Sequence, residues 1–89
     1  SKERGIKMIL RELYNILPVW QQENFFSKNF TDFEIICANT GLHYHKGKTE
    51  DEIVIGGFYE EPMSKDWVLG LPVVNIDARE NRVRIWVDG

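Results

Sequence analysis

The chain has 89 residues and a mass of 10.5 kDa, which is enough for one domain. It is 43% hydrophobic and 28% charged, so it is too apolar for a disordered tail and too charged for a membrane segment. The formal charge of −3 argues against general nucleic-acid binding. Its single cysteine excludes an internal disulfide framework. We expect one domain over residues 1–89, with no membrane contact and no cofactor. The chain ends at Asp88-Gly89 directly after its last predicted strand, so we also expect it to be a piece of a longer protein.

Two helices are predicted in the N-terminal third. Apolar residues recur there at the i, i+3, i+4, i+7 spacing of one helix face, which indicates an amphipathic helix. Pro18 ends this pattern because proline cannot continue the hydrogen-bond ladder, and it can start a second short helix over residues 18–28. The apolar positions are Ile6, Ile9, Leu10, Leu13, Ile16 and Leu17 in the first helix. In the second they are Val19, Trp20, Phe25 and Phe26, which would cover a sheet.

Strand spacing of two begins near residue 31. Residues 31–46 are expected to form a hairpin, and residues 52–59 a third strand. A long apolar stretch, residues 67–77, should bend at its internal proline or lie at a sheet edge. A turn in which Asn81 accepts a positive φ leads to the last strand, residues 83–87. The predicted fold class is α+β, with helices packed on one face of a four- to six-stranded antiparallel meander.

The pair His43 and His45 is the first candidate for chemistry. Residues two apart in a strand point the same way, so both rings would lie close enough to share a metal. The alternative is that both histidines lie on a solvated face while Tyr44 packs inward. Cys37 is expected to be a small buried hydrophobe, with these two histidines as the candidate bases for a nucleophilic role. The candidate third metal ligands are Cys37, Glu50, Asp51 and Glu52.

The second candidate is the set Arg82, Arg84 and Trp86. These residues share one face of the last strand, and guanidinium groups beside an indole can hold phosphates and stack bases. The alternative is a solvated strand face whose arginines pair with Asp or Glu across the sheet. The acidic total of the chain favours that alternative.

The aromatic residues are the third candidate. The chain has 3 Trp, 3 Tyr and 5 Phe, more rings than so small a core can hold. Exposed aromatics with neighbouring charge are typical of protein interfaces, although Trp20 and Trp67 would equally fit as caps at the ends of the core. The residues predicted to bind a partner are Trp86, Tyr59, Phe58, Trp67, Arg84 and Arg82.

The C-terminal segment resembles known small proteins. Its strand–turn–strand pattern, with Ile76-Asp77 before the turn and Val83 to Trp86 and Asp88-Gly89 after it, is similar to the end of XisI-like excision-control proteins. It is also similar to small α+β immunity proteins of bacterial toxin systems. The resemblance implies an α+β fold and an accessory or immunity role, and no functional residue is carried over from it.

The function predicted from the sequence is a small, non-enzymatic, cytoplasmic protein-binding module of the inhibitor, immunity or mobile-element accessory type. Its partner would be another protein or, in a homodimer, a second copy, reached through aromatics on the sheet face and loops. No catalytic residue is predicted, because glycine-rich phosphate loops, nucleophile elbows and zincin motifs are absent from the sequence. The alternative is a small-ligand or metal-binding domain, with or without catalysis, built on His43 and His45. A nucleic-acid-contacting regulator acting through Arg82, Arg84 and Trp86 is the third hypothesis.

Overall fold

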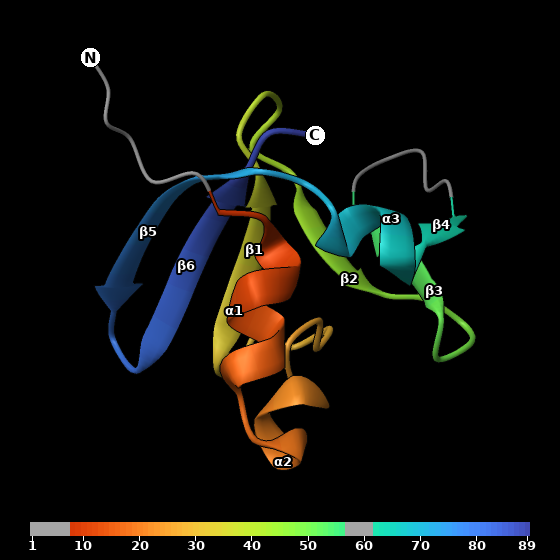
Figure 1. The fold of residues 1–89 in the computed structure, drawn as a ribbon, viewed down its shortest axis with the longest axis horizontal. Helices are drawn as coiled ribbons and strands as arrows, with labels where there is room; N and C mark the ends of the chain where they lie inside the picture. Colours follow the sequence, from red (N-terminus) through yellow and green to blue (C-terminus); the bar gives the residue numbers. More distant parts are fainter. Residues whose placement is uncertain (1–7, 57–61) are drawn as a thin grey trace.

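The computed structural model describes residues 8–56 and 62–89. Within these ranges it has three helices and a six-stranded sheet, which confirms the α+β class (Figure 1). The elements in chain order are α1 (Leu10–Ile16), α2 (Val19–Gln22), β1 (Phe33–Cys37), β2 (His43–Lys46), β3 (Glu52–Ile55), β4 (Pro62–Ser64), α3 (Lys65–Leu69), β5 (Val73–Arg79) and β6 (Arg82–Val87).

The sheet is mixed, and the predicted antiparallel meander is wrong in one place. The strand order is β4-β3-β2-β1-β6-β5, in which four neighbouring pairs are antiparallel and β1 pairs with β6 in parallel. A meander would have placed the last strand at the edge. Instead β6 lies inside the sheet, because its alternate residues Val83, Ile85 and Val87 pair with the apolar residues of β1 and pack on the core. The more polar and exposed β5 takes the edge position.

The predicted first hairpin and last hairpin are confirmed. In the first, β1 and β2 pair antiparallel with Ile35 opposite Tyr44. In the last, the turn between β5 and β6 places Glu80 and Asn81 at φ values of 54° and 67°. Positive φ at both central residues gives a turn whose twist matches that of the flanking strands, as expected for Asn81.

The first helix is shorter and less amphipathic than expected. It ends at Ile16, in agreement with the stop expected before Pro18, but Ile9 is its extended N-cap and forms a β-bridge to Pro72. Leu10 is fully buried, whereas Ile16 is mostly exposed because the chain reverses direction just after it. Ile6 lies outside the described residues.

The second helix is confirmed only as a four-residue piece. Phe25 and Phe26 follow it in turns and are buried in the core, as expected. Val19 and Trp20 were expected to cover the sheet but are exposed, because the helix lies at the end of α1 rather than over the strands (Figure 1).

The stretch 67–77 was expected to be extended, but its first part is helical. Ser64 caps α3 by accepting a hydrogen bond from the backbone N–H of Asp66 (3.1 Å), and Gly70 ends the helix. The helix buries Val68 and Leu69, and the strand begins only after Pro72. A side-chain cap placed immediately before the apolar run therefore overrides its β propensity.

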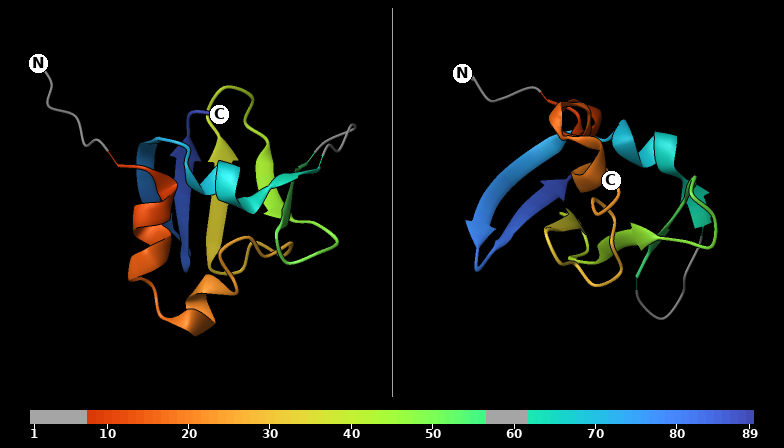
Figure 2. Two further views of the ribbon diagram at one scale, coloured as in Figure 1. Left: turned by 45° about the vertical axis from the view of Figure 1, so that its right-hand side comes forward. Right: turned by 90° about the horizontal axis from the view of Figure 1, so that it is seen from below.

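The two faces of the sheet have different environments. Helices α1 and α3 lie on one face, and the core is between them and the strands (Figure 2). The other face, called the open face below, carries the alternate residues of each strand. In β1, β2 and β6 these are Glu34, Ile36, His43, His45, Arg82, Arg84 and Trp86.

Candidate functional site

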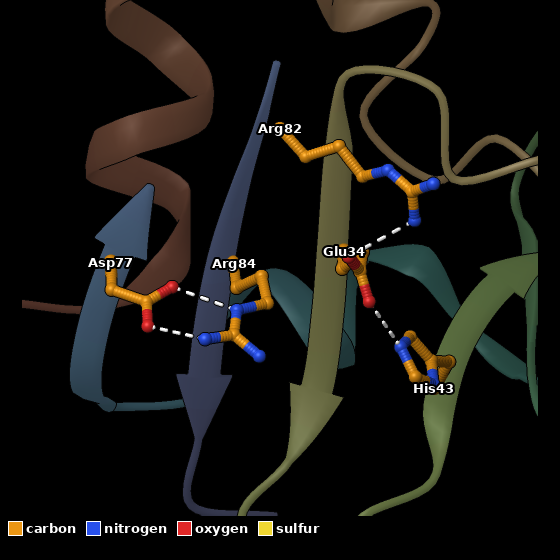
Figure 3. A network of polar contacts seen from close by, with 5 residues as sticks. All are labelled: Glu34, His43, Asp77, Arg82 and Arg84. Atoms are coloured by element: carbon orange, nitrogen blue, oxygen red, sulfur yellow. Dashed lines mark hydrogen bonds and ion pairs between the residues drawn. The ribbon is translucent and has the colours of Figure 1, made fainter. Parts of the chain in front are cut away.

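A row of charged side chains crosses the open face at the centre of the sheet (Figure 3). The Nε2 of His43 donates to the Oε1 of Glu34 at 2.8 Å, and the Nη1 of Arg82 donates to its Oε2 at 3.2 Å. One carboxylate on β1 therefore bridges side chains from both neighbouring strands. The Glu34 side chain is only 16% exposed, so this carboxylate is well shielded from water.

A second pair lies beside the first. Arg84 binds Asp77 with two parallel hydrogen bonds, Nε to Oδ1 at 2.8 Å and Nη2 to Oδ2 at 2.5 Å (Figure 3). The guanidinium carbon of Arg84 also lies 4.9 Å from the ring centroid of Trp86. The bond from Arg84 holds the pKa of Asp77 below its ordinary value, and the bond to Asp77 raises the pKa of Arg84. Arg84 is thus fixed between a carboxylate and an indole face.

A loop closes over the histidine end of this row. The ring of Phe30 lies 4.7 Å from that of His43 and 6.5 Å from that of His45, measured between centroids. Phe30 has a φ of 51°, a left-handed conformation that is uncommon for a bulky residue and disfavoured by about 1–2 kcal/mol. The backbone of Phe30 is therefore held in this disfavoured conformation by the surrounding packing, and this conformation places its ring against His43. A shallow surface hollow next to the contact is lined by Lys28, Leu42 and Gly56 together with these rings.

The Glu34 network predicts how stability depends on pH. The hydrogen bond from His43 is the largest effect on the pKa of Glu34 and lowers it below its usual 4.5. Burial opposes this shift, and the hydrogen bond and charge of Arg82 add to it. A carboxyl group whose pKa is depressed by folding stabilises the protein at pH values above its unfolded pKa. This contribution is lost as the pH falls through the lowered, folded-state value.

We expect Glu34→Gln to lower the free energy of unfolding by about 1–2 kcal/mol at pH 7, because His43 and Arg82 both lose a charged acceptor. The difference in the free energy of unfolding between the variant and the wild type should shrink below pH 4.5, where the carboxylate of wild-type Glu34 itself becomes protonated. Urea titrations monitored by tryptophan fluorescence between pH 3 and pH 7 would measure both effects. Glu23→Gln, on an exposed residue after α2, is the control and should leave the pH profile unchanged. If the difference in the free energy of unfolding were the same at every pH, the Glu34 carboxylate would not be the source of this pH dependence.

The structure places the two predicted metal ligands together, and residues 8–56 and 62–89 supply no third. His43 and His45 share the open face of β2, as predicted, and the Nδ1 of His45 donates to the carbonyl of Lys46 at 3.0 Å. Among the residues that the structure describes, no group of three His, Cys, Asp or Glu side chains could hold a metal ion. Cys37 lies on the opposite, core-facing side of the sheet, and Glu52 accepts from the backbone N–H of Lys48 at 2.7 Å.

Cys37 is a buried core residue, as predicted. Burial raises the pKa of its thiol, but hydrogen bonds from Thr40, Asn39 and Tyr44 together outweigh it and lower the pKa overall. Burial and the neighbouring Cys37 raise the pKa of Tyr44 to about 12. Because both histidines lie across the sheet from Cys37, they are not placed to act as its base.

The residues predicted to bind a partner do not form one surface. Arg82, Arg84 and Trp86 lie together on the open face, where the two arginines are already paired with carboxylates, as the solvated-face alternative expected. Trp67 is 54% exposed on α3, on the helix-covered side. Phe58 and Tyr59 lie outside the described residues.

The most exposed group of large apolar residues in the described part of the chain was not among the residues predicted to bind a partner. Ile16, Val19 and Trp20, called the corner patch below, are 76%, 69% and 62% exposed where α1 turns into α2. The sequence signal at this place is limited: Pro18 predicts a break in the helix, but it does not indicate which of the flanking apolar residues face the core.

Comparisons with protein families, curated proteins and solved structures give no match to this chain. In the described part of the chain, no helix is long and apolar enough to span a membrane.

Proposed function

We propose that this chain is a small, non-enzymatic protein-binding module whose main docking surface is the corner patch. The observation that carries this proposal is the exposure of Ile16, Val19 and Trp20, three large apolar side chains within five residues. Isolated exposed apolar residues are ordinary, but a group that includes a tryptophan is typical of an interaction site.

The corner patch is held by contacts that do not depend on a partner. Gln22 donates from Nε2 to the carbonyl of Tyr14 at 2.9 Å, which fixes α2 against the end of α1. The backbone N–H groups of Gln21 and Gln22 both bond to the carbonyl of Pro18, at 2.9 and 3.0 Å. A preformed surface loses less conformational entropy on binding than a flexible one, which favours tight association.

The charge of the chain indicates the chemistry of the partner. The net charge is −3, and Glu23 is exposed directly after α2. A partner with an apolar groove bordered by basic residues would complement both features and be steered towards this end of the molecule. Such a module fits the inhibitor, immunity or mobile-element accessory types, and its free, buried Cys37 fits a reducing cytoplasm.

The other two hypotheses have weaker support from the geometry. A phosphate backbone would have to displace Glu34 and Asp77 from the arginines of the open face before it could bind them. A metal would have two histidines but no third protein ligand among the described residues. The Trp86 face of the sheet is accordingly a secondary candidate for docking.

The test is capture of a partner from the native host, followed by affinity measurement with the purified partner. Trp20→Ala should weaken binding at least about 30-fold, since interface tryptophans commonly contribute 2 kcal/mol or more. Trp67→Ala is the matched control: its indole is similarly exposed but has no other exposed large apolar residue in its helix, and its affinity should change less than about 3-fold.

Circular dichroism would show that both variants are folded. Equal affinities for the wild type and Trp20→Ala would remove the corner patch from the proposal. Loss of binding with Trp67→Ala alone would move the docking surface to α3.

A further inference from the structure

The edge strand β5 has the properties of a surface that pairs with another strand. In an antiparallel ladder every second residue directs its backbone N–H and C=O away from its neighbour. The N–H of Ile76 bonds to the side chain of Asn75 at 2.9 Å rather than to β6. The backbone N–H and C=O groups of Ile76, and therefore those of Ala78, are directed away from β6 towards the free edge of the sheet. Within the described residues, no strand pairs with this outer side of β5 beyond Val73.

The start of β5 is protected, and the rest is not. The N–H of Val73 bonds to the carbonyl of Met8 at 2.8 Å, and Ile9 bridges to Pro72, so the chain itself covers this end of the edge. At the opposite edge of the sheet, β4 is only three residues long and begins with Pro62, features that discourage strand addition. Beyond Val73, β5 has no proline within it and no strand beside it in the described residues. A strand added there would have to displace the Asn75 side chain from the N–H of Ile76 and tolerate the register shift between Val73 and Asn75.

Apolar side chains flank the open part of this edge. Val74 is 55% and Ile76 is 43% exposed. Ile76 lies opposite the core residue Ile85 and therefore on the side of the sheet that carries the helices. It remains exposed because α1 lies over the centre of the sheet and does not reach β5 (Figure 1).

We propose that the chain forms a twofold-symmetric dimer in which β5 pairs antiparallel with β5 of a second copy, with the axis at Ile76. The geometry and charge of the strand select this register. With the axis at Ile76, each Val74 faces Ala78 of the other copy and each Asn75 faces Asp77, an amide beside a carboxylate. With the axis at Asp77, two like charges would meet directly across the ladder, which is unfavourable. With the axis at Ala78, Asp77 would face Arg79, but Ile76 would face Glu80, which lies in the turn beyond the end of β5, so fewer strand residues would pair.

The two-copy arrangement fits the surface better than a foreign strand of unknown sequence. A twofold axis presents the same patch twice, so the two Ile76 side chains meet on the helix side and Asn75 meets Asp77 on the open side without any additional partner. The dimer would extend one six-stranded sheet into a continuous twelve-stranded sheet. The pairing covers about five residues from each copy, so we expect a modest interface with a dissociation constant in about the micromolar range. This inference does not depend on the corner patch or on its partner.

The test is the mass of the full chain in solution, measured by sedimentation velocity from about 1 to about 500 µM. The wild type should pass from 10.5 kDa to twice that mass as its concentration rises. Ile76→Lys should stay monomeric, because two lysines would meet at the axis, and Ile76→Glu should do the same. An equimolar mixture of these two variants should form a heterodimer, since lysine then faces glutamate.

Leu42→Lys is the matched control, because Leu42 is an exposed apolar residue directly before β2, and β1 and β6 lie between β2 and β5, so its dimerisation should equal that of the wild type. Circular dichroism would confirm that each variant is folded. A wild type that stays monomeric at every concentration would overturn the proposal, and so would a dimer that persists in Ile76→Lys. Failure of the two charged variants to associate when mixed would overturn the register. None of these outcomes changes the result expected for partner capture with Trp20→Ala.

Discussion

Replacing Phe25 with alanine is expected to lower the free energy of unfolding by about 3–5 kcal/mol. Phe25 is fully buried, and its ring centroid lies 5.3, 5.2 and 5.0 Å from those of Tyr14, Phe26 and Phe33. The substitution removes all three contacts and leaves a cavity. Because an 89-residue chain has a total stability of about 4–13 kcal/mol, this loss is a large share of it. Urea denaturation followed by tryptophan fluorescence would measure the change.

Two further variants keep this prediction testable. Phe25→Leu should lose less stability than Phe25→Ala, because leucine fills part of the cavity, and it serves if the alanine variant does not fold. Trp20→Ala should change stability by less than about 0.5 kcal/mol, since Trp20 lies mostly in solvent. If Phe25→Ala unfolded at the same urea concentration as the wild type, the aromatic cluster would not be the centre of the core.

The parallel pairing of β1 with β6 is expected to appear as energetic coupling between Ile35 and Ile85. These two buried side chains are direct neighbours across the two strands. Ile85→Ala alone should lower the free energy of unfolding by about 2–5 kcal/mol, and Ile35→Val by about 0.5–1.5 kcal/mol. In the double variant the two effects should differ from their sum by at least about 0.5 kcal/mol, because residues in contact share the same cavity.

The control for this cycle uses Ile53, a buried residue of β3 that lies two strands beyond β1 in the sheet. Three strand spacings of about 4.8 Å separate it from β6, so Ile53→Val and Ile85→Ala should add within about 0.3–0.5 kcal/mol. Denaturant titrations of all six proteins give both cycles. Additivity in the Ile35 cycle would count against direct packing between β1 and β6.

The local elements could be predicted from residue patterns because short-range physics determines them. The alternation from Phe33 to Cys37 and the return at His43 define the first hairpin, and Asn81 marks the last turn. Pro18 sets the end of α1. The helix α3 was missed because three apolar residues after Lys65 fit a strand as well as a helix, and the Ser64 cap decides between them.

The candidate site was only partly visible in the sequence. The period of two placed His43 with His45, and Arg82 with Arg84, each on one strand face. This periodicity could not show that β2 and β6 lie on either side of β1. That arrangement brings His43 and Arg82 to the same carboxylate, that of Glu34. The exposure of Val19 and Trp20 likewise depends on where α2 lies relative to the sheet.

By itself, the sequence determined the α+β class, the two hairpins and the side of each strand on which a residue lies, because these follow from hydrogen bonding and side-chain alternation within a few residues. Only the tertiary structure decided that β6 pairs in parallel with β1, that β5 becomes an edge, and that the corner patch stays in solvent. The pairing of β1 with β6 depends on contacts between residues 48 or more positions apart, such as Glu34 and Arg82, and local periodicity has no information about which distant strands meet.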